Sequence, residues 1–280
     1  MASSIAAFES RQALPSTSNS PALDVRGHTL ILPCVSIGNV GQLAVDILLA
    51  STLSTGEKAE YFCDLDARYC VPFVGASTEA NHPSLRTPLQ VFTFPKSKLT
   101  IIQQRSPILK THKDQFVANL GKWAQEKGFS EIICLAGIDA GLRTDTQMQH
   151  PFWHLTSSSS QSVSSSPLSA SFAKLLPVYT RANTHAIHEL TRNTGGNDDS
   201  IPPMPAGGLV RKLLKAAKKE PNWLPTTALL VFAAEGDNRA DAMAMAKLIV
   251  NTSQDNKNSQ LSQPSDWNLL FGPPLEPGMF

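Results

Sequence analysis

The stretch LPCVSIGNVGQLAVDILLAS, residues 32–51, runs from an apolar strand pattern through a turn with two glycines into an apolar helix pattern. The strand pattern starts at residue 29 and contains Pro33, whose missing amide hydrogen predicts an edge strand or a bend. The helix pattern spans 38–52, and its eight apolar residues fall on two neighbouring faces, so we expect it to be buried on more than one side. A strand that leads directly into a helix is typical of an α/β unit.

The same alternation of strand and helix patterns continues along the chain. Residues 114–128 repeat apolar side chains at helical spacing and end at a glycine, and 130–138 form the continuous apolar run of a strand covered on both faces. We therefore predict an α/β fold: a three-layer α/β/α domain with a largely parallel central sheet. Further strand patterns occupy 60–66, 89–95, 98–106 and 226–237, and further helix patterns occupy 202–220 and 238–252.

The 280 residues are enough for one large core, and no internal repeat divides them. Residues 1–24 are small, polar and interrupted by prolines, which predicts a disordered N-terminal tail. Residues 25–280 are predicted to form a single α/β domain with a mobile insertion near 156–200, because eight of the ten residues 157–166 are serine. Prolines and glycines in 272–280 predict an extended C-terminal tail.

The composition argues against several classes of protein. The net charge is +1, so the chain has no general basic field that would favour nucleic acid. Apolar runs stay shorter than the roughly 18 residues of a membrane span, so we expect no membrane association. We also expect no metal site and no disulfide framework, because the cysteines lack metal-ligand or disulfide spacing. They are Cys34, Cys63, Cys70 and Cys134.

The glycine-bearing turn raises one alternative function. Ser36-x-Gly38-x-x-Gly41 lies where dinucleotide-binding proteins carry three glycines between a strand and a helix. Ser36 replaces the first glycine, and Asp64 stands a few residues beyond the usual position of the acidic residue that binds ribose. A nucleotide- or nucleoside-binding α/β enzyme that uses Gly38 and Gly41 is the alternative, and a tight corner without a ligand is the interpretation we favour.

Other polar patterns supply no set of nucleophile, base and orienting group, so we do not expect an enzyme. Glu235 and Asp237 follow a buried strand, where open α/β sheets bind ligands, but a turn and a helix cap explain them as well. The basic helix pattern at 210–219 is interpreted as a solvated helix face. Two histidine pairs are interpreted as surface residues and not as metal ligands: His150 with His154, and His185 with His188.

The last residues combine bulky apolar side chains with prolines. Residues 267–271 are expected to pack on the domain, and the tail after them ends in Met279 and Phe280. An apolar end of this kind fits a known mode of recognition, in which a pocket takes the side chains and a cation or backbone amides take the carboxylate. Function by protein binding is therefore a second class of hypothesis beside the enzyme.

Five stretches of the chain, taken in order, carry a further signal. They are LILPCVSIGNVGQLAVDILLAST at 30–52, YFCDLDARYCVPFVG at 61–75, PAGGLVRKLL at 205–214, ALLVFAAEGDN at 228–238 and WNLLFG at 267–272. Together they resemble the proteasome assembly chaperone 2 family. The resemblance runs from about residue 28 to the C-terminus and skips the serine-rich insertion.

This resemblance implies a protein that is not an enzyme and needs no cofactor. Members of the family pair with proteasome assembly chaperone 1 in a heterodimer, which binds the α-subunit ring of the 20S proteasome core particle. The heterodimer promotes assembly of the ring and prevents premature ring dimerisation. The resemblance also implies an α/β fold and a location in the cytoplasm and nucleus.

The resemblance further implies where partners bind. The family carries a C-terminal tripeptide that enters pockets between α subunits, and it falls here on Gly278, Met279 and Phe280. Met279 stands where the family has tyrosine, and Gly278 stands where it has a hydrophobic residue. The apolar helix after the turn is a candidate partner interface through Val40, Leu43 and Ile47.

Overall fold

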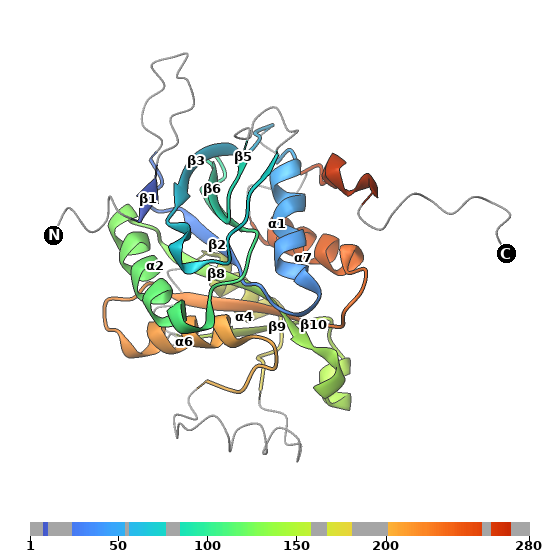
Figure 1. The fold of residues 1–280 in the computed structure, drawn as a ribbon. Helices are drawn as coiled ribbons and strands as arrows, with labels where there is room; N and C mark the ends of the chain where they lie inside the picture. Colours follow the sequence, from blue (N-terminus) through green and yellow to red (C-terminus); the bar gives the residue numbers. More distant parts are fainter. Residues whose placement is uncertain are drawn as a thin grey trace, which may run out of the picture.

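The computed structural model describes residues 8–10, 24–53, 56–76, 85–157, 167–180, 201–253 and 259–269. An eight-stranded sheet with the strand order β1-β3-β6-β7-β2-β8-β10-β9 lies at its centre, and helices cover both faces (Figure 1). The strands of this sheet are β1 Glu9–Ser10, β2 Thr29–Pro33, β3 Glu60–Leu65, β6 Leu89–Phe94, β7 Leu99–Gln104, β8 Glu131–Asp139, β9 Phe152–Thr156 and β10 Thr226–Ala233. A separate two-stranded sheet joins β4 Gly75–Ala76 and β5 Leu85–Arg86.

The central strands β7, β2, β8 and β10 are mutually parallel, and antiparallel strands complete the sheet on both sides. In total β2, β3, β7, β8 and β10 run in one direction, and β1, β6 and β9 run in the other. The predicted α/β class is confirmed. The predicted strand pair 89–95 and 98–106 is the antiparallel pair β6–β7.

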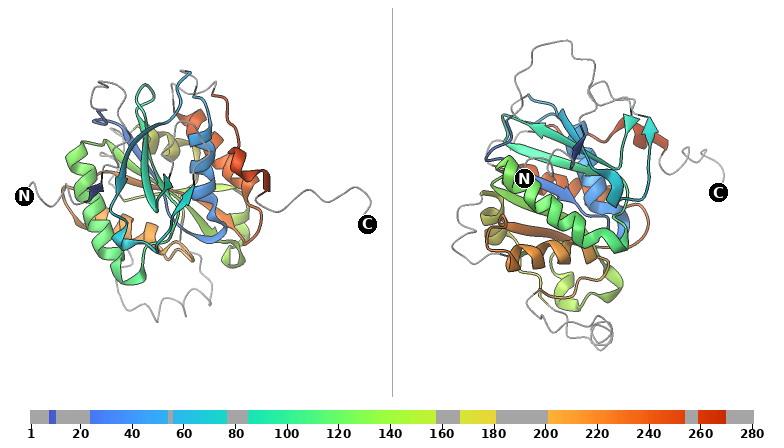
Figure 2. Two further views of the ribbon diagram at one scale, coloured as in Figure 1. Left: turned by 45° about the horizontal axis from the view of Figure 1, so that its top comes forward. Right: turned by 60° about the vertical axis from the view of Figure 1, so that its left-hand side comes forward.

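Helices form a layer on each face of the sheet. α2 and α6 pack together on one face, and α1 and α7 pack together on the other, as Figure 2 shows from two further sides. β2 alternates between the two cores, because Leu30 and Leu32 face the first helix pair and Ile31 faces the second. The helices are α1 Val40–Ala50, α2 Lys113–Lys127, α4 Pro167–Leu175, α6 Gly208–Lys219 and α7 Arg239–Thr252.

Two predicted unstructured regions contain ordered elements. Within the predicted tail 1–24, Phe8 is buried among aromatic rings, and Glu9–Ser10 form β1 against β3, which corrects the prediction for these residues. Within the predicted insertion 156–200, α4 packs on the sheet with Phe172 fully buried, which corrects the prediction for this helix. Residues 1–7, 11–23, 158–166 and 181–200 of these two regions lie outside the described residues.

Glu131 fixes α4 to the sheet. Its carboxylate is fully buried at the start of β8 and accepts a hydrogen bond of 2.9 Å from the Thr29 hydroxyl. At the start of α4 the same carboxylate accepts bonds of 3.1 Å from the backbone amides of Leu168 and Ser169, and one of 2.5 Å from the Ser169 hydroxyl. A carboxylate at this position satisfies amides that have no partner within the helix.

Pro33 does not lie in an edge strand, since β2 pairs with β7 on one side and β8 on the other. Proline is accommodated because it is the last residue of β2, beyond the register with β7, which ends at Ile31. Among the described residues, no helix is long and apolar enough to cross a membrane.

Candidate functional site

The turn that joins β2 to α1 is held by backbone geometry and by Ser36. Gly38 has φ 67° and Asn39 has φ 50°, so two successive residues take the left-handed conformation. The Ser36 hydroxyl donates to the carbonyl of Cys34 at 3.0 Å and accepts from the amide of Gly137 at 2.9 Å. Ser36 therefore stands where a dinucleotide-binding turn has glycine, and its side chain links the end of β2 to β8.

Both glycines of the turn are close to other parts of the protein. A methyl group on Gly38 would lie 2.7 Å from the side-chain nitrogen of Asn238, and one on Gly41 would lie 2.6 Å from the carbonyl oxygen of Leu135. The space beside Gly38 is thus occupied by a side chain from the start of α7. These contacts support the interpretation of the turn as a tight corner in which glycine permits close packing.

Asp64 is not placed to bind a ribose at this turn. It lies on β3, and β6 and β7 separate that strand from β2 in the sheet. Burial raises the pKa of its carboxyl above the usual value, and the carboxylate accepts a hydrogen bond of 3.0 Å from Thr87. In a dinucleotide-binding fold the strand with the acidic residue lies next to the first strand, so this topology disfavours the nucleotide alternative.

The carboxylates after β10 have structural partners. Asp237 accepts from the backbone amide of Arg239 at 3.1 Å and pairs with its guanidinium at 2.7 Å, and these hydrogen bonds lower the pKa of the Asp237 carboxyl. The side chain of Asn238 donates to the carbonyls of Ala234 and Gly236 and makes no cap on α7. Glu235 is exposed beside them. This segment is therefore explained as a turn into α7.

The histidines do not form a metal site in the described ranges, where no group of ligand residues converges. His150 is exposed against the Trp153 ring, and His154 is buried on β9 with Nδ1 3.1 Å from the Pro177 carbonyl. Burial lowers the pKa of His154, so the prediction of two surface histidines is wrong for this one. His185 and His188 lie outside the described residues.

The helix predicted as a partner interface is divided between core and surface. Val40 and Ile47 are fully buried in the core of the domain, so they cannot contact a partner from these positions. Leu43 is half-buried and lines a pocket at the surface. The interface therefore stays a prediction only for Leu43, on the half-buried side of α1. Another apolar side of α1 is covered by α7.

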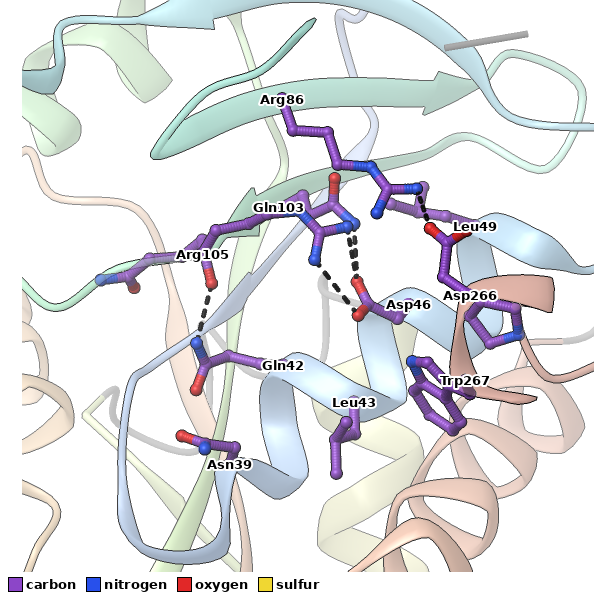
Figure 3. A pocket seen from close by; sticks show the side chains of 12 residues that line it. Asn39, Gln42, Leu43, Asp46, Leu49, Arg86, Gln103, Arg105, Asp266 and Trp267 are labelled. Atoms are coloured by element: carbon purple, nitrogen blue, oxygen red, sulfur yellow. Dashed lines mark hydrogen bonds and ion pairs between the residues drawn. The ribbon is translucent and has the colours of Figure 1, made fainter. Parts of the chain in front are cut away.

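The pocket has a volume of about 290 Å³ and lies between α1, the end of β7, β5 and the segment 264–267 (Figure 3). Its wall is mostly polar. Its lining includes Gln42, Leu43, Asp46, Arg86, Gln103, Arg105 and Asp266.

Ion pairs and amide hydrogen bonds hold this wall together. Asp46 of α1 accepts from the Gln103 side chain at 2.6 Å and pairs with Arg105 at 3.4 Å. Arg86 of β5 pairs with Asp266, which connects the segment 264–267 to the small sheet. Sequence reasoning missed this site because its residues come from four separate chain segments and form no motif. Only the two consecutive glutamines that end the apolar strand β7 gave a local signal.

The C-terminal candidates Gly278, Met279 and Phe280 lie outside the described residues. The segment before them is anchored, because Trp267 in the short helix Ser265–Leu269 is buried against the α1 and α7 core. This confirms that the chain near 267 packs on the domain.

The basic helix α6 is a solvated helix on the other face. Lys212 pairs with Asp114 of α2, and Arg211 donates to the carbonyl of Ile201 at 3.2 Å. Its apolar side, with Leu213 and Leu214, is buried. This arrangement agrees with the prediction that the basic residues of α6 lie on a solvated face of the helix.

The fold and the turn define a three-layer α/β protein in which Asn238, at the start of α7, packs against Gly38 of the turn between β2 and α1. The model of the PAC2 family matches residues 30–220, and the chain belongs to that family. Proteasome assembly chaperone 2 of Nematostella vectensis is 34% identical over 237 residues, which cover 83% of this chain and 91% of that protein. The human protein of that name is 31% identical, with 92% and 97% covered. The family resemblance is confirmed.

Solved structures share the fold at low sequence identity. Pyrococcus furiosus PbaA, described as an archaeal homolog of proteasome-assembly chaperone, has a TM-score of 0.53 at 16% identity, with 82% of each chain covered. A Thermoplasma acidophilum protein of unknown function has a TM-score of 0.55 at 14% identity, with 90% of this chain and 88% of that one covered. At these identities the likeness concerns the fold alone.

Proposed function

We propose that this protein is a chaperone for assembly of the 20S proteasome core particle and works by binding other proteins. The observation that carries the proposal is the match to proteasome assembly chaperone 2 over almost the whole length of both chains, 92% and 97% for the human protein. The packing of Asn238 against Gly38 supports a role without a nucleotide.

In this proposal the chain forms a heterodimer with proteasome assembly chaperone 1. The heterodimer binds α subunits, promotes formation of the α-ring and prevents off-pathway dimerisation of rings. Two linked contacts, one by the domain and one by the tail, would bind the ring more tightly than either contact alone, because the second contact is made at high effective concentration. We place this activity in the cytoplasm and nucleus.

The C-terminal tripeptide is proposed as the part that docks on the α-ring. Gly278, Met279 and Phe280 offer two apolar side chains and a carboxylate, which a pocket with a basic residue would bind. Burial of Trp267 supports this role, because it gives the tail a fixed starting point on the domain.

Deletion of 278–280 tests this function. We expect the α-ring affinity of the heterodimer to fall at least about tenfold, since the tail contact is lost, and the heterodimer itself to stay intact. Ring affinity can be measured by surface plasmon resonance, and heterodimer mass by light scattering. Glu276→Ser serves as a matched control in the same tail. Equal ring affinity of the truncated and full chains would refute the role of the tripeptide.

A further inference from the structure

The N-terminal strand β1 lies on the domain in the manner of a bound peptide. It is the outermost strand of the sheet and pairs antiparallel with β3 through two positions (Figure 1). The Asp66 amide extends this contact by donating to the carbonyl of Phe8 at 2.8 Å, and the Phe8 side chain is only 4% exposed. Backbone bonds to a sheet edge, together with a side chain in a pocket, are the geometry of peptide recognition by strand addition.

The Phe8 ring enters an aromatic socket, which we define as the side chains of Tyr69, Phe116 and Trp123. Its centroid lies 6.4 Å from the centroid of each of these three rings. Tyr69 ends the short helix Ala67–Tyr69 that follows β3, and the other two rings belong to the buried side of α2. The edge of β3 and the socket therefore form one site, and residues 8–10 occupy it.

Contacts that do not involve Phe8 hold the socket in shape. The side-chain nitrogen of Asn119 donates to the Tyr69 hydroxyl at 2.6 Å, and the Tyr69 ring packs edge-on against Phe116 with centroids 6.3 Å apart. The Trp123 ring packs against that of Phe129 at 5.3 Å. A site that other contacts hold in shape is preorganised, so an aromatic side chain can enter it without the cost of ordering the site.

The occupant is held by fewer contacts than the site. The described contact spans three residues, 8–10, and thirteen residues, 11–23, separate it in sequence from Asp24, where the described chain resumes. Short contacts near a chain terminus open locally at a lower free energy than central strands, which exchange only when the domain unfolds. We therefore expect this segment to leave the socket while β3 and α2 stay folded.

We propose that the edge of β3 and the aromatic socket bind an extended segment of a partner protein that carries phenylalanine, and that residues 8–10 are an autoinhibitory occupant of this site. The partner segment displaces them, forms the same backbone bonds with β3 and places its phenylalanine ring in the socket. The chemistry of this partner follows from the segment that is seated there. The inference does not depend on the proposed function, because it uses neither the C-terminal tripeptide nor a proteasome subunit.

A fluorescein-labelled peptide of residues 5–12, IAAFESRQ, tests the site on the full chain. We expect fluorescence anisotropy to show saturable binding to the natural chain. Binding to the Phe8→Ala chain should be at least about tenfold tighter, because a weaker internal occupant leaves the site open for a larger fraction of the time.

Two controls test whether binding depends on the socket. The same peptide with alanine in place of its phenylalanine should show no saturable binding. Leu175→Ala, at a 64% exposed apolar residue of α4, is the matched control chain and should bind the natural peptide within about twofold of the natural chain. Circular dichroism and thermal melting verify that each chain folds.

Amide hydrogen exchange of the natural chain tests the inference even if Phe8→Ala does not fold. We expect the Asp66 amide to have a protection factor at least about a hundredfold lower than that of the Ile133 amide in the central strand β8. Equal protection of the two amides would overturn the inference, because residues 8–10 would then leave only when the whole domain unfolds. Equal peptide affinity of the natural and folded Phe8→Ala chains would also overturn it, as would absence of binding to both.

Discussion

Glu131 shows how one buried carboxylate decides the position of an entire helix. Its four hydrogen-bond donors come from β2 and from the first turn of α4, so the side chain joins segments far apart in sequence. Sequence alone did not identify it, because a single glutamate at the start of an apolar run has the same pattern as a solvated strand end. Its role depends on burial, which pattern reasoning does not supply.

Replacement of this carboxylate by an amide tests its contribution to stability. We expect Glu131→Gln to lower the free energy of unfolding by about 2–3 kcal/mol, because charge-assisted hydrogen bonds are lost and an amide nitrogen then faces backbone donors. Urea denaturation followed by tryptophan fluorescence measures the change. Glu126→Gln on the exposed side of α2 is the control, with an expected change within about 0.5 kcal/mol. Similar values for the two variants would contradict this role of Glu131.

At the scale of elements, strong periodicity predicted the central helices and strands well. The pattern at 114–128 corresponds to α2, which ends at Gly128 in the left-handed conformation, and the apolar run 130–138 corresponds to β8. β9 was missed because it has only five residues, and α4 was missed because it directly follows the serine-rich stretch; in both, tertiary contacts determine the structure. The pocket was missed for a related reason, since its residues become neighbours only after folding.

The packing of α1 against α7 explains why α1 is apolar on more than one side. Ala44 on α1 and Ala242 and Ala246 on α7 are fully buried in the core between these helices and the sheet. Small side chains allow close approach of helices, and a larger one in a filled core causes strain.

We therefore expect Ala246→Leu to lower the free energy of unfolding by about 1–3 kcal/mol, because the larger side chain overpacks this core. Ala240→Leu, at an exposed position of the same helix, should be within about 0.5 kcal/mol of the natural chain. Chemical denaturation of both variants makes the comparison. An Ala246→Leu variant with the same free energy of unfolding as the natural chain would contradict tight packing of α1 against α7.

For the whole molecule, the sheet order and the packing at Gly38 disfavour a dinucleotide site at the turn between β2 and α1. β3 lies away from β2 in the sheet, so Gly38 and Asp64 cannot act on one ligand. The sequence contained the glycines but could not show that Asn238 packs on Gly38, because the two residues are 200 positions apart.

Thermal melting in the presence of ATP, NAD or adenosine tests this conclusion. We expect no saturable rise in melting temperature, whereas a ligand at a hundred times its dissociation constant would add about 2.7 kcal/mol of stability. An established nucleotide-binding protein in the same assay is the positive control. A saturable rise that Gly41→Val abolishes would favour the enzyme instead.

The anchoring of Trp267 also limits how far the end of this chain can extend. From a fixed origin, the residues after it through Phe280 span at most about 45 Å when fully extended. Any receptor cavity for Met279 and Phe280 must open within that radius of the anchor, whatever path the intervening prolines take. The position of the domain thus limits which cavities the tail can reach. In a complex that holds Trp267 farther than this from a cavity, Met279 and Phe280 cannot enter that cavity.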